Sequence, residues 1–143
     1  MIVAPWLFWA ALSAAFAALM TILAKAGLRG IDPDFAQLIR TAVIFPTLAA
    51  FVLFTGKWQS MAGWNARTWT LLVLSGMATG ASWVCYFRAL NVGEASRVAA
   101  VDKLSFVIVA VLATTLLHER LGFASWCGIG LIAAGLVIVC MAK

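Results

Sequence analysis

The chain has 143 residues, of which 65% are hydrophobic and 10% charged, and its formal net charge is +5. A soluble domain carries roughly 25% charged residues, so this composition excludes an ordinary soluble globular protein. The basic residues stand singly near the ends of apolar stretches, where Lys and Arg side chains reach the lipid headgroups. We therefore expect a protein of the lipid bilayer that binds no nucleic acid.

Five apolar stretches are long enough to cross a membrane. A hydrocarbon core of ~30 Å needs roughly 20 helical residues at a rise of ~1.5 Å each. The stretches are residues 4–25, 35–54, 68–90, 98–117 and 124–141. No Lys or Arg precedes the first, so we expect a true span rather than a cleaved signal. The predicted fold is an all-α membrane protein, a single domain over residues 1–143 with five transmembrane helices.

The boundaries of these spans carry residues typical of helix ends. Asp32 and Pro33 are suited to open the second span as N-cap and first helical residue, and Asn65 can cap the third. Ser96 is the expected cap of the fourth span. Pro46 is expected to kink the second. With five spans, the two termini lie on opposite sides of the membrane.

The orientation in the membrane is weakly encoded. The side of the N-terminus holds 3 Lys or Arg and the other side 7, which favours an N-terminus outside the cytoplasm. When the three that lie within spans are set aside, the ratio is 3 to 4, so insertion in both orientations stays open. The N-terminal side also carries six of the seven tryptophans: Trp6, Trp9, Trp58, Trp64, Trp69 and Trp126.

Arg40 is a charge within the second span. It follows Pro33 by seven residues, which places it about 10 Å along the helix at ~1.5 Å per residue. Charged residues at such depth usually face the interior of a helix bundle or water. The alternative is that the side chain reaches back to the headgroups. Lys25 and Arg88 stand at helix C-termini, where the helix dipole favours a cation.

Polar residues follow one face of the third span. Ser75, Thr79, Ser82 and Tyr86 recur at i, i+4, i+7 and i+11, and Trp83 is adjacent to that face. Hydroxyl and small residues are common at contacts between membrane helices. Two interpretations therefore stay open, a close helix contact or the wall of a substrate cavity.

Asp102 and Lys103 are neighbours near the second turn of the fourth span. Consecutive helical residues point about 100° apart, so we expect the two side chains to pair poorly with each other. Each then needs a partner from another helix or from a ligand. One interpretation is a structural ion pair with Arg40 or Arg88 at the same membrane level. The other is a polar pocket for a zwitterionic or anionic solute.

Signals for catalysis are absent from the sequence. It contains no HExxH or GxSxG motif and no cluster of metal-ligand residues, and its three cysteines lie in apolar runs without CxxC spacing. We expect neither an enzyme nor a bound metal or cofactor.

Two segments resemble the EamA domain of the drug/metabolite transporter superfamily. Residues 118–139, HERLGFASWCGIGLIAAGLVIV, are similar to the end of that domain, where a GERL turn leads into a glycine-spaced last helix. His118 stands in the place of the usual Gly. Residues 86–105, YFRALNVGEASRVAAVDKLS, resemble its junction of third and fourth helices, with Ala100 where many members have Pro. The resemblance covers essentially the whole chain.

The resemblance implies that the chain pairs with a second one. Most members join two such domains, inverted relative to each other, in ten spans, and this sequence is like one half. A homodimer, or a pair with a related five-span chain, is implied. Gly128 and Gly135 resemble the glycines through which small multidrug resistance proteins dimerise. Those proteins also depend on a carboxylate in the first helix, which this sequence lacks, so their proton/drug antiport is not expected.

We expect a secondary transporter of the bacterial inner membrane that exports small polar metabolites, such as amino-acid-like solutes, by alternating access of a dimer. Arg40, Tyr86 and Lys103 would contact polar groups of the substrate and Trp83 an apolar part, while Asp102 would orient the bases. Ser75, Thr79 and Ser82 complete the candidate site. Two alternatives stay open: a multidrug exporter, for which a broader aromatic cavity and an acid near mid-membrane are expected, and a non-transporting subunit of a larger assembly.

Overall fold

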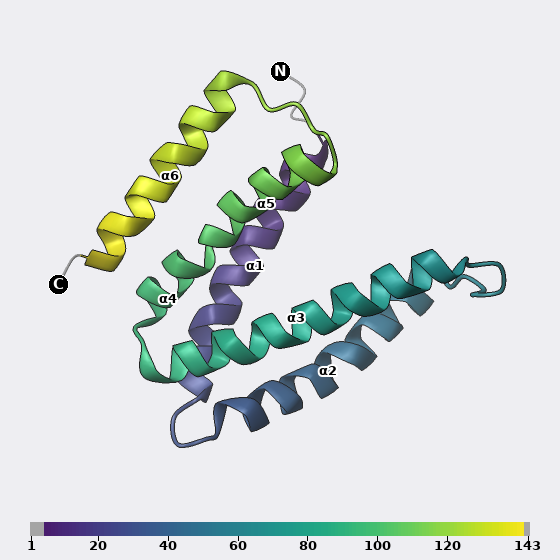
Figure 1. Ribbon diagram of the computed structural model, residues 1–143. Helices are drawn as coiled ribbons and strands as arrows, with labels where there is room; N and C mark the ends of the chain where they lie inside the picture. The colour runs from purple at the N-terminus through teal and green to yellow at the C-terminus, as the bar shows by residue number, and fades with distance from the viewer. Residues whose placement is uncertain (1–4, 142–143) are drawn as a thin grey trace. The chain divides into compact units, whose positions relative to one another are not determined.

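The computed structural model describes residues 5–141, which form six α-helices joined by short loops (Figure 1). In chain order the helices are α1 (Pro5–Gly27), α2 (Pro33–Phe54), α3 (Ala66–Val92), α4 (Ala95–Asp102), α5 (Leu104–Leu116) and α6 (Phe123–Met141).

The six helices make five segments that are long and apolar enough to cross a membrane. They are Trp6–Gly27, Pro33–Phe54, Ala66–Val92, Ala95–Leu116 and Phe123–Met141, so α4 and α5 together make the fourth span. Large apolar side chains along these helices are exposed, as lipid-facing residues must be. The predicted all-α fold with five membrane spans is confirmed.

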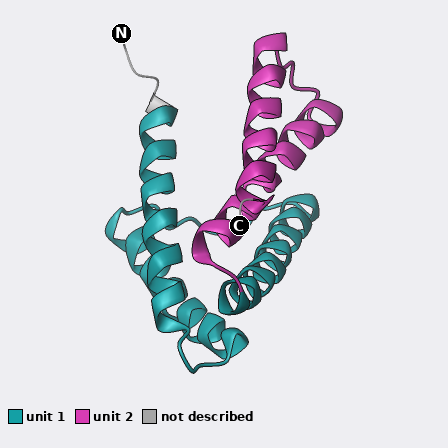
Figure 2. Ribbon diagram, turned by 90° about the vertical axis from the view of Figure 1, so that its left-hand side faces the viewer, with its two compact units in different colours: residues 1–92 teal, residues 93–143 magenta. Residues whose placement is uncertain are grey.

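The chain divides into two compact units, residues 1–92 and residues 93–143 (Figure 2). The first contains α1, α2 and α3, and the second contains α4, α5 and α6. That the two units act as one domain stays a prediction.

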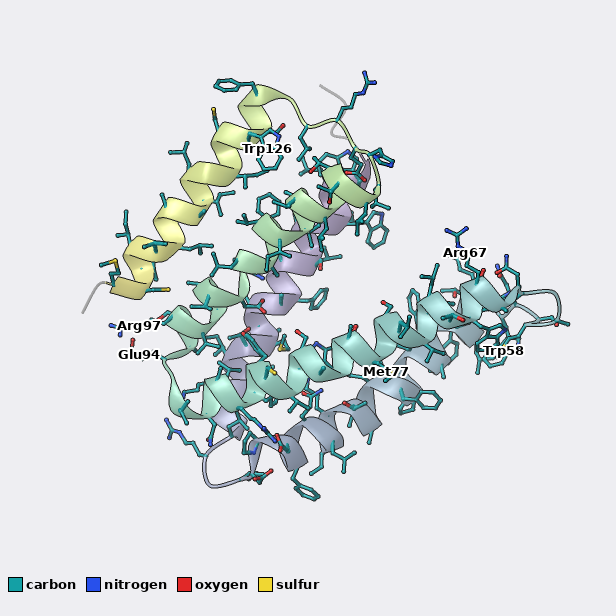
Figure 3. All side chains as sticks on the ribbon, viewed as in Figure 1. Trp58, Arg67, Met77, Glu94, Arg97 and Trp126 are labelled. Carbon is teal, nitrogen blue, oxygen red and sulfur yellow. The ribbon has the colours of Figure 1, made fainter. Side chains whose placement is uncertain are left out.

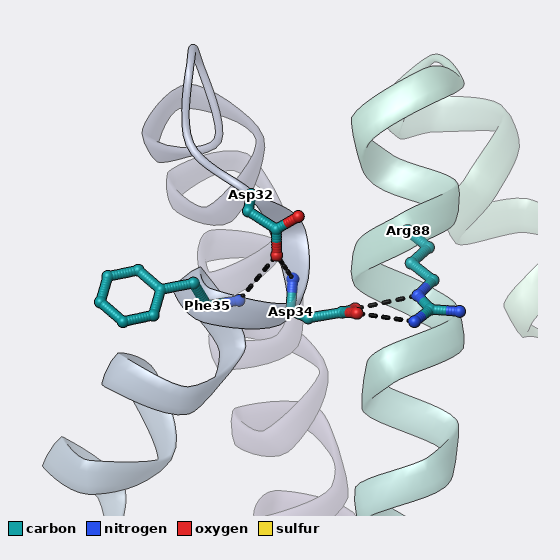
Figure 4. A network of polar contacts seen from close by, with 4 residues as sticks. All are labelled: Asp32, Asp34, Phe35 and Arg88. Atoms are coloured by element: carbon teal, nitrogen blue, oxygen red, sulfur yellow. Dashed lines mark hydrogen bonds and ion pairs between the residues drawn. The ribbon is translucent and has the colours of Figure 1, made fainter.

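The helix ends of the first unit follow the predicted caps. The Asp32 carboxylate accepts hydrogen bonds from the backbone N–H of Asp34 at 2.9 Å and of Phe35 at 3.1 Å, and Pro33 is the first residue of α2 (Figure 4). Asn65 accepts from the N–H of Thr68 at 2.7 Å. These bonds satisfy N–H groups that the first turn of a helix leaves without a partner.

An ion pair joins α2 to α3 at the end of the unit where α2 begins. Arg88 donates through Nε to Oδ1 of Asp34 at 2.9 Å and through Nη2 to Oδ2 at 2.6 Å (Figure 4). This is the bidentate geometry that a guanidinium and a carboxylate favour. The helix-dipole role predicted for Arg88 thus omitted its main contact, which lies 54 positions away in the sequence.

Polar bonds also join α1 to α3. The Thr21 hydroxyl donates to the carbonyl of Ala17 at 2.9 Å, so its oxygen accepts from the Tyr86 hydroxyl at 2.7 Å. One turn further along α1, Lys25 donates to the carbonyl of Leu90. Leu90 is fully buried at this contact. Helix α3 therefore packs against both other helices of its unit.

The second unit packs α4 and α5 against α6, with Ala110 and Ile129 buried. The predicted cap at Ser96 is wrong. Glu94 has the extended backbone of an N-cap residue (φ −71°, ψ 135°), and its carbonyl accepts the first helical bond, from the N–H of Val98 at 2.9 Å. Ser96 lies inside the first turn, because the backbone of Glu94 starts the helix two residues earlier.

His118 follows α5 with a left-handed backbone, φ 55°. A side chain at positive φ is unfavourable, and glycine adopts this region at no steric cost. The position where the related motif has Gly is therefore one whose conformation suits Gly.

The bond between Thr21 and Tyr86 gives a test of the packing of α1 on α3. We expect Tyr86→Phe to lower the free energy of unfolding by ~0.6 kcal/mol, the average for a hydrogen bond between membrane helices. Thr21→Val should cost more, because it leaves the Tyr86 hydroxyl without its acceptor. The double variant should cost less than the sum, as measured by reversible unfolding in mixed micelles. Strictly additive losses would show that the two hydroxyls do not interact.

Candidate functional site

Arg40 lies over two aromatic rings of α3. Its guanidinium carbon is 4.8 Å from the ring centroid of Trp83 and 5.2 Å from that of Phe87. The two rings stand four residues apart, and therefore on one face of α3. A guanidinium within about 6 Å of a ring centroid is attracted by the ring's negative face, most strongly where water is excluded. The rings thus stabilise a charge within the second span.

Gln37, one turn before Arg40, accepts a hydrogen bond from the guanidinium. Its side chain is buried, at 5% exposure, and its Oε1 accepts from Nη1 of Arg40 at 3.3 Å. The Nε2 of Gln37 donates to Oγ1 of Thr41 at 3.2 Å, and the Thr41 hydroxyl donates back to the Gln37 carbonyl at 2.9 Å. This local chain of hydrogen bonds holds the amide with its oxygen toward Arg40.

No carboxylate balances the charge of Arg40 within the first unit. Among residues 5–92, the ion pair formed is that of Arg88 with Asp34, and Arg40 has none. An ionised group in a membrane span normally pairs with an opposite charge or lines a path for a solute. Arg40 is held here by ring faces and an amide alone.

A cavity of about 410 Å³ lies beside Arg40, between α1, the loop that follows it, α2 and α3. Among the described residues that line it, Arg40 carries the only charge, and the others are apolar. The lining consists of Met20, Leu23, Ala24, Gly27, Leu28, Ile31, Ala36, Ile39, Arg40 and Phe87. Arg40 thus lies on a cavity wall, as expected from the sequence, but the lining around it is apolar where polar groups were expected.

The polar face predicted on α3 divides into two parts. Ser75, Thr79 and Ser82 are exposed, and the Thr79 hydroxyl donates to the backbone carbonyl of Ser75 at 2.9 Å. Trp83 and Tyr86 are half-buried, the first under Arg40 and the second in its bond to Thr21. The part of this face near Arg40 is thus engaged within the unit. The participation of these five residues in substrate binding stays a prediction.

Asp102 and Lys103 pair with each other, contrary to the prediction. The Lys103 Nζ lies 3.6 Å from Oδ2 of Asp102. Helix α4 ends at Asp102 and α5 starts at Leu104, so Lys103 joins two helices. Its N–H bonds to the carbonyl of Ala100, three residues back, and its ψ is −9°. The prediction that the two side chains point about 100° apart assumed an unbroken helix. This tighter turn and the long Lys side chain let the two groups meet.

The polar residues of α4 near its start also pair locally. Arg97 and Glu94, labelled in Figure 3, form an ion pair with 3.0 Å between Nε and Oε2. That Asp102 or Lys103 contacts a side chain from another helix, or a substrate, stays a prediction.

Gly128 and Gly135 lie along α6 with open space beside them. A Cβ added at either position would meet, apart from its chain neighbours and the nearby backbone of α6, no atom of the described residues within 4 Å. The same holds for Gly130, which lies between them. These positions leave room for the close approach of another helix.

Two features of the site were not predicted from the sequence. Phe87 contributes to the Arg40 contacts, and Asp34 is engaged by Arg88. A signal for the first was present, since Trp83 and Phe87 share a helical face in the sequence. The pairing of Asp34 with Arg88 depends on the contact of two helices and has no local signal.

Comparison with known proteins identifies the family. Residues 4–141 match the model of the EamA-like transporter family. A Sinorhizobium protein described as an uncharacterized transporter in the cobO 3′ region is 53% identical over 134 residues, which is 94% of this chain and 95% of that protein. No solved structure matches the chain. With its five apolar spans, the chain is an integral, multi-pass membrane transporter and belongs to the EamA-like transporter family.

Proposed function

We propose that this protein is a secondary transporter of the bacterial inner membrane that exports small polar metabolites, such as amino-acid-like solutes. The observation that carries the proposal is Arg40, a cation in a membrane span with no carboxylate partner among residues 5–92 and with a cavity beside it. An ionisable residue in that setting is best explained as part of a solute path. Catalysis is no part of the proposal.

The candidate substrate-binding residues divide the contacts with the substrate. Arg40 binds an acidic group of the substrate, and Trp83, whose ring lies against the guanidinium, contacts an apolar part. Tyr86, whose hydroxyl also bonds to Thr21, and Lys103 contact polar groups of the substrate, and Asp102 orients the bases. Ser75, Thr79 and Ser82 extend the path along α3 to other membrane depths.

The multidrug alternative fits the cavity less well. Many exported drugs are cations, and a carboxylate in the membrane is the group that would attract them. The cavity beside Arg40 is lined by a cation and, among the described residues, by no acid. A non-transporting subunit remains the second candidate, because the exposed Ser75, Thr79 and Ser82 would suit a partner's helix.

A dimer working by alternating access completes the proposal. Two five-span chains would build the ten-span pathway typical of the superfamily. The space beside Gly128 and Gly135 supports α6 as part of the contact surface. The break at Lys103 supplies a joint within the fourth span, and interrupted helices are common where transporters bind and move solutes.

Uptake into liposomes tests the transport function. The purified protein, reconstituted in lipid vesicles, should accumulate one or more members of a mixed pool of labelled amino acids and organic acids. Arg40→Gln should lower the rate at limiting substrate at least about tenfold, the loss expected when a hydrogen bond to a charged group is removed. Arg29→Gln is the matched control, because Arg29 is an exposed residue of the loop after α1. Uptake that is equal in vesicles with and without protein would contradict the proposal.

Leucine substitutions on α6 test the dimer. Gly128→Leu with Gly135→Leu should convert the dimer to a monomer of unchanged helix content, because the branched side chains keep the second helix away. Gly130→Leu is the matched control, since Gly130 lies about 200° around the helix from Gly128 at ~100° per residue. Subunit capture by cross-linking in vesicles reads the outcome. A dimer that survives the double substitution would place the contact elsewhere.

A further inference from the structure

The edge of the Arg40 guanidinium has unused hydrogen-bonding capacity. A guanidinium has five N–H donors in one plane. Its carbon lies 4.8 Å from the Trp83 ring centroid and 5.2 Å from that of Phe87, and within residues 5–92 a single hydrogen bond of this group, to Gln37, is formed. The remaining donors have the spacing that matches the two oxygens of a carboxylate. These donors are therefore suited to an anion.

The cavity beside Arg40 is suited to an apolar body. Its volume of about 410 Å³ lies within the range of small-molecule sites, and aliphatic side chains and the Phe87 ring form nearly all of its described lining. A polar or charged substituent buried there would lose its hydration without gaining a partner.

The described residues that line the cavity offer no charged partner to a ligand's ammonium. No carboxylate is found among its described lining residues. Asp34, one turn and a half before Arg40, is held by both of its oxygens to Arg88. An ammonium placed in the cavity would be an unpaired buried charge, which is costly.

From this charge balance we propose that the substrate is an organic anion with an apolar body and no cationic group. Its carboxylate would bind the open edge of Arg40, and its apolar body would fill the cavity between α1, α2 and α3. The inference rests on the proposed transport function and replaces the amino-acid-like solutes named there with organic anions, because amino acids at neutral pH carry an ammonium that the described lining of the cavity cannot pair.

An anionic lipid offers the same chemistry, an anionic head on an apolar body. The depth of Arg40 favours a solute over a lipid. Arg40 lies seven residues past the start of α2, or about 10 Å along the helix at ~1.5 Å per residue. A lipid phosphate would have to leave the headgroup layer to reach the guanidinium.

Three probes that share a phenylethyl body separate the charge classes: 3-phenylpropionate, phenylalanine and 2-phenylethylamine. Equilibrium binding is measured with the intact protein in nanodiscs of phosphatidylcholine. We expect 3-phenylpropionate to bind at least about tenfold more tightly than phenylalanine, and 2-phenylethylamine not to bind, because a buried unpaired charge is penalised. Phenylalanine binding as tightly as 3-phenylpropionate would overturn the inference.

Variants assign the binding to this site. Arg40→Gln should abolish binding of 3-phenylpropionate, and so should Ala36→Phe, which fills the cavity and leaves the cation in place. Arg29→Gln, which removes a charge at the same membrane end outside the cavity, should leave binding unchanged. Binding that survives both Arg40→Gln and Ala36→Phe would place the anion elsewhere and overturn the assignment.

Phosphatidylglycerol separates the two sources of anion. Unchanged probe binding in nanodiscs that contain this lipid supports a soluble substrate, whereas competitive loss of the probe would assign the site to a lipid and overturn the substrate class.

Failure of this inference can be told apart from failure of the proposed transport function. Liposome uptake of another solute without binding of 3-phenylpropionate overturns this inference alone, and binding without uptake of any solute overturns the transport proposal.

Discussion

A guanidinium inside a membrane span must be stabilised by something other than water, and this requirement organises the first unit. Arg40 meets it with two ring faces of α3 and the buried amide of Gln37. Cation–π attraction strengthens when water is removed, and it uses no hydrogen-bond acceptor on the ring. An ion pair with a carboxylate would occupy N–H donors of the guanidinium. The arrangement therefore maintains a cation without neutralising it, which is what recognition of an anion requires.

The contacts of α3 with its two neighbours set the geometry that Arg40 needs. Arg88 clamps α3 to the start of α2 through Asp34, and Tyr86 joins it to α1 through Thr21. Next to these contacts, the rings of Trp83 and Phe87 lie against Arg40, and residues of α1 line the cavity beside it. Polar bonds between helices matter in a bilayer because lipid chains provide no hydrophobic force that drives helices together. The geometry of the candidate site thus depends on a few specific bonds between helices.

Features fixed by adjacent residues could be predicted from the sequence. Length and composition alone specify five membrane helices, and the cap at Asp32 follows from its side chain and the next residue, Pro33. The predicted cap at Ser96 was wrong because the true N-cap residue, Glu94, starts α4 through its backbone alone. Its carboxylate makes no cap hydrogen bond, so the sequence carries no side-chain signal for this helix start. The prediction that Asp102 and Lys103 pair poorly was wrong because it assumed an uninterrupted helix across these two residues. The position of Arg40 within the second span could be predicted from the sequence. Its aromatic partners could not, because they depend on the contact of α2 with α3.

If Arg40 presents an uncompensated positive charge to the cavity, that charge attracts small anions to residues of the cavity wall. The reaction of Ala36→Cys with small anionic and cationic methanethiosulfonate reagents measures this attraction, in a background where the exposed Cys85, Cys127 and Cys140 are replaced by Ala. We expect the ratio of the anionic rate to the cationic rate to fall when Arg40→Gln is added, because the local cation is removed. An equal ratio of rates with Arg and with Gln at position 40 would show that Arg40 carries no uncompensated charge toward the cavity.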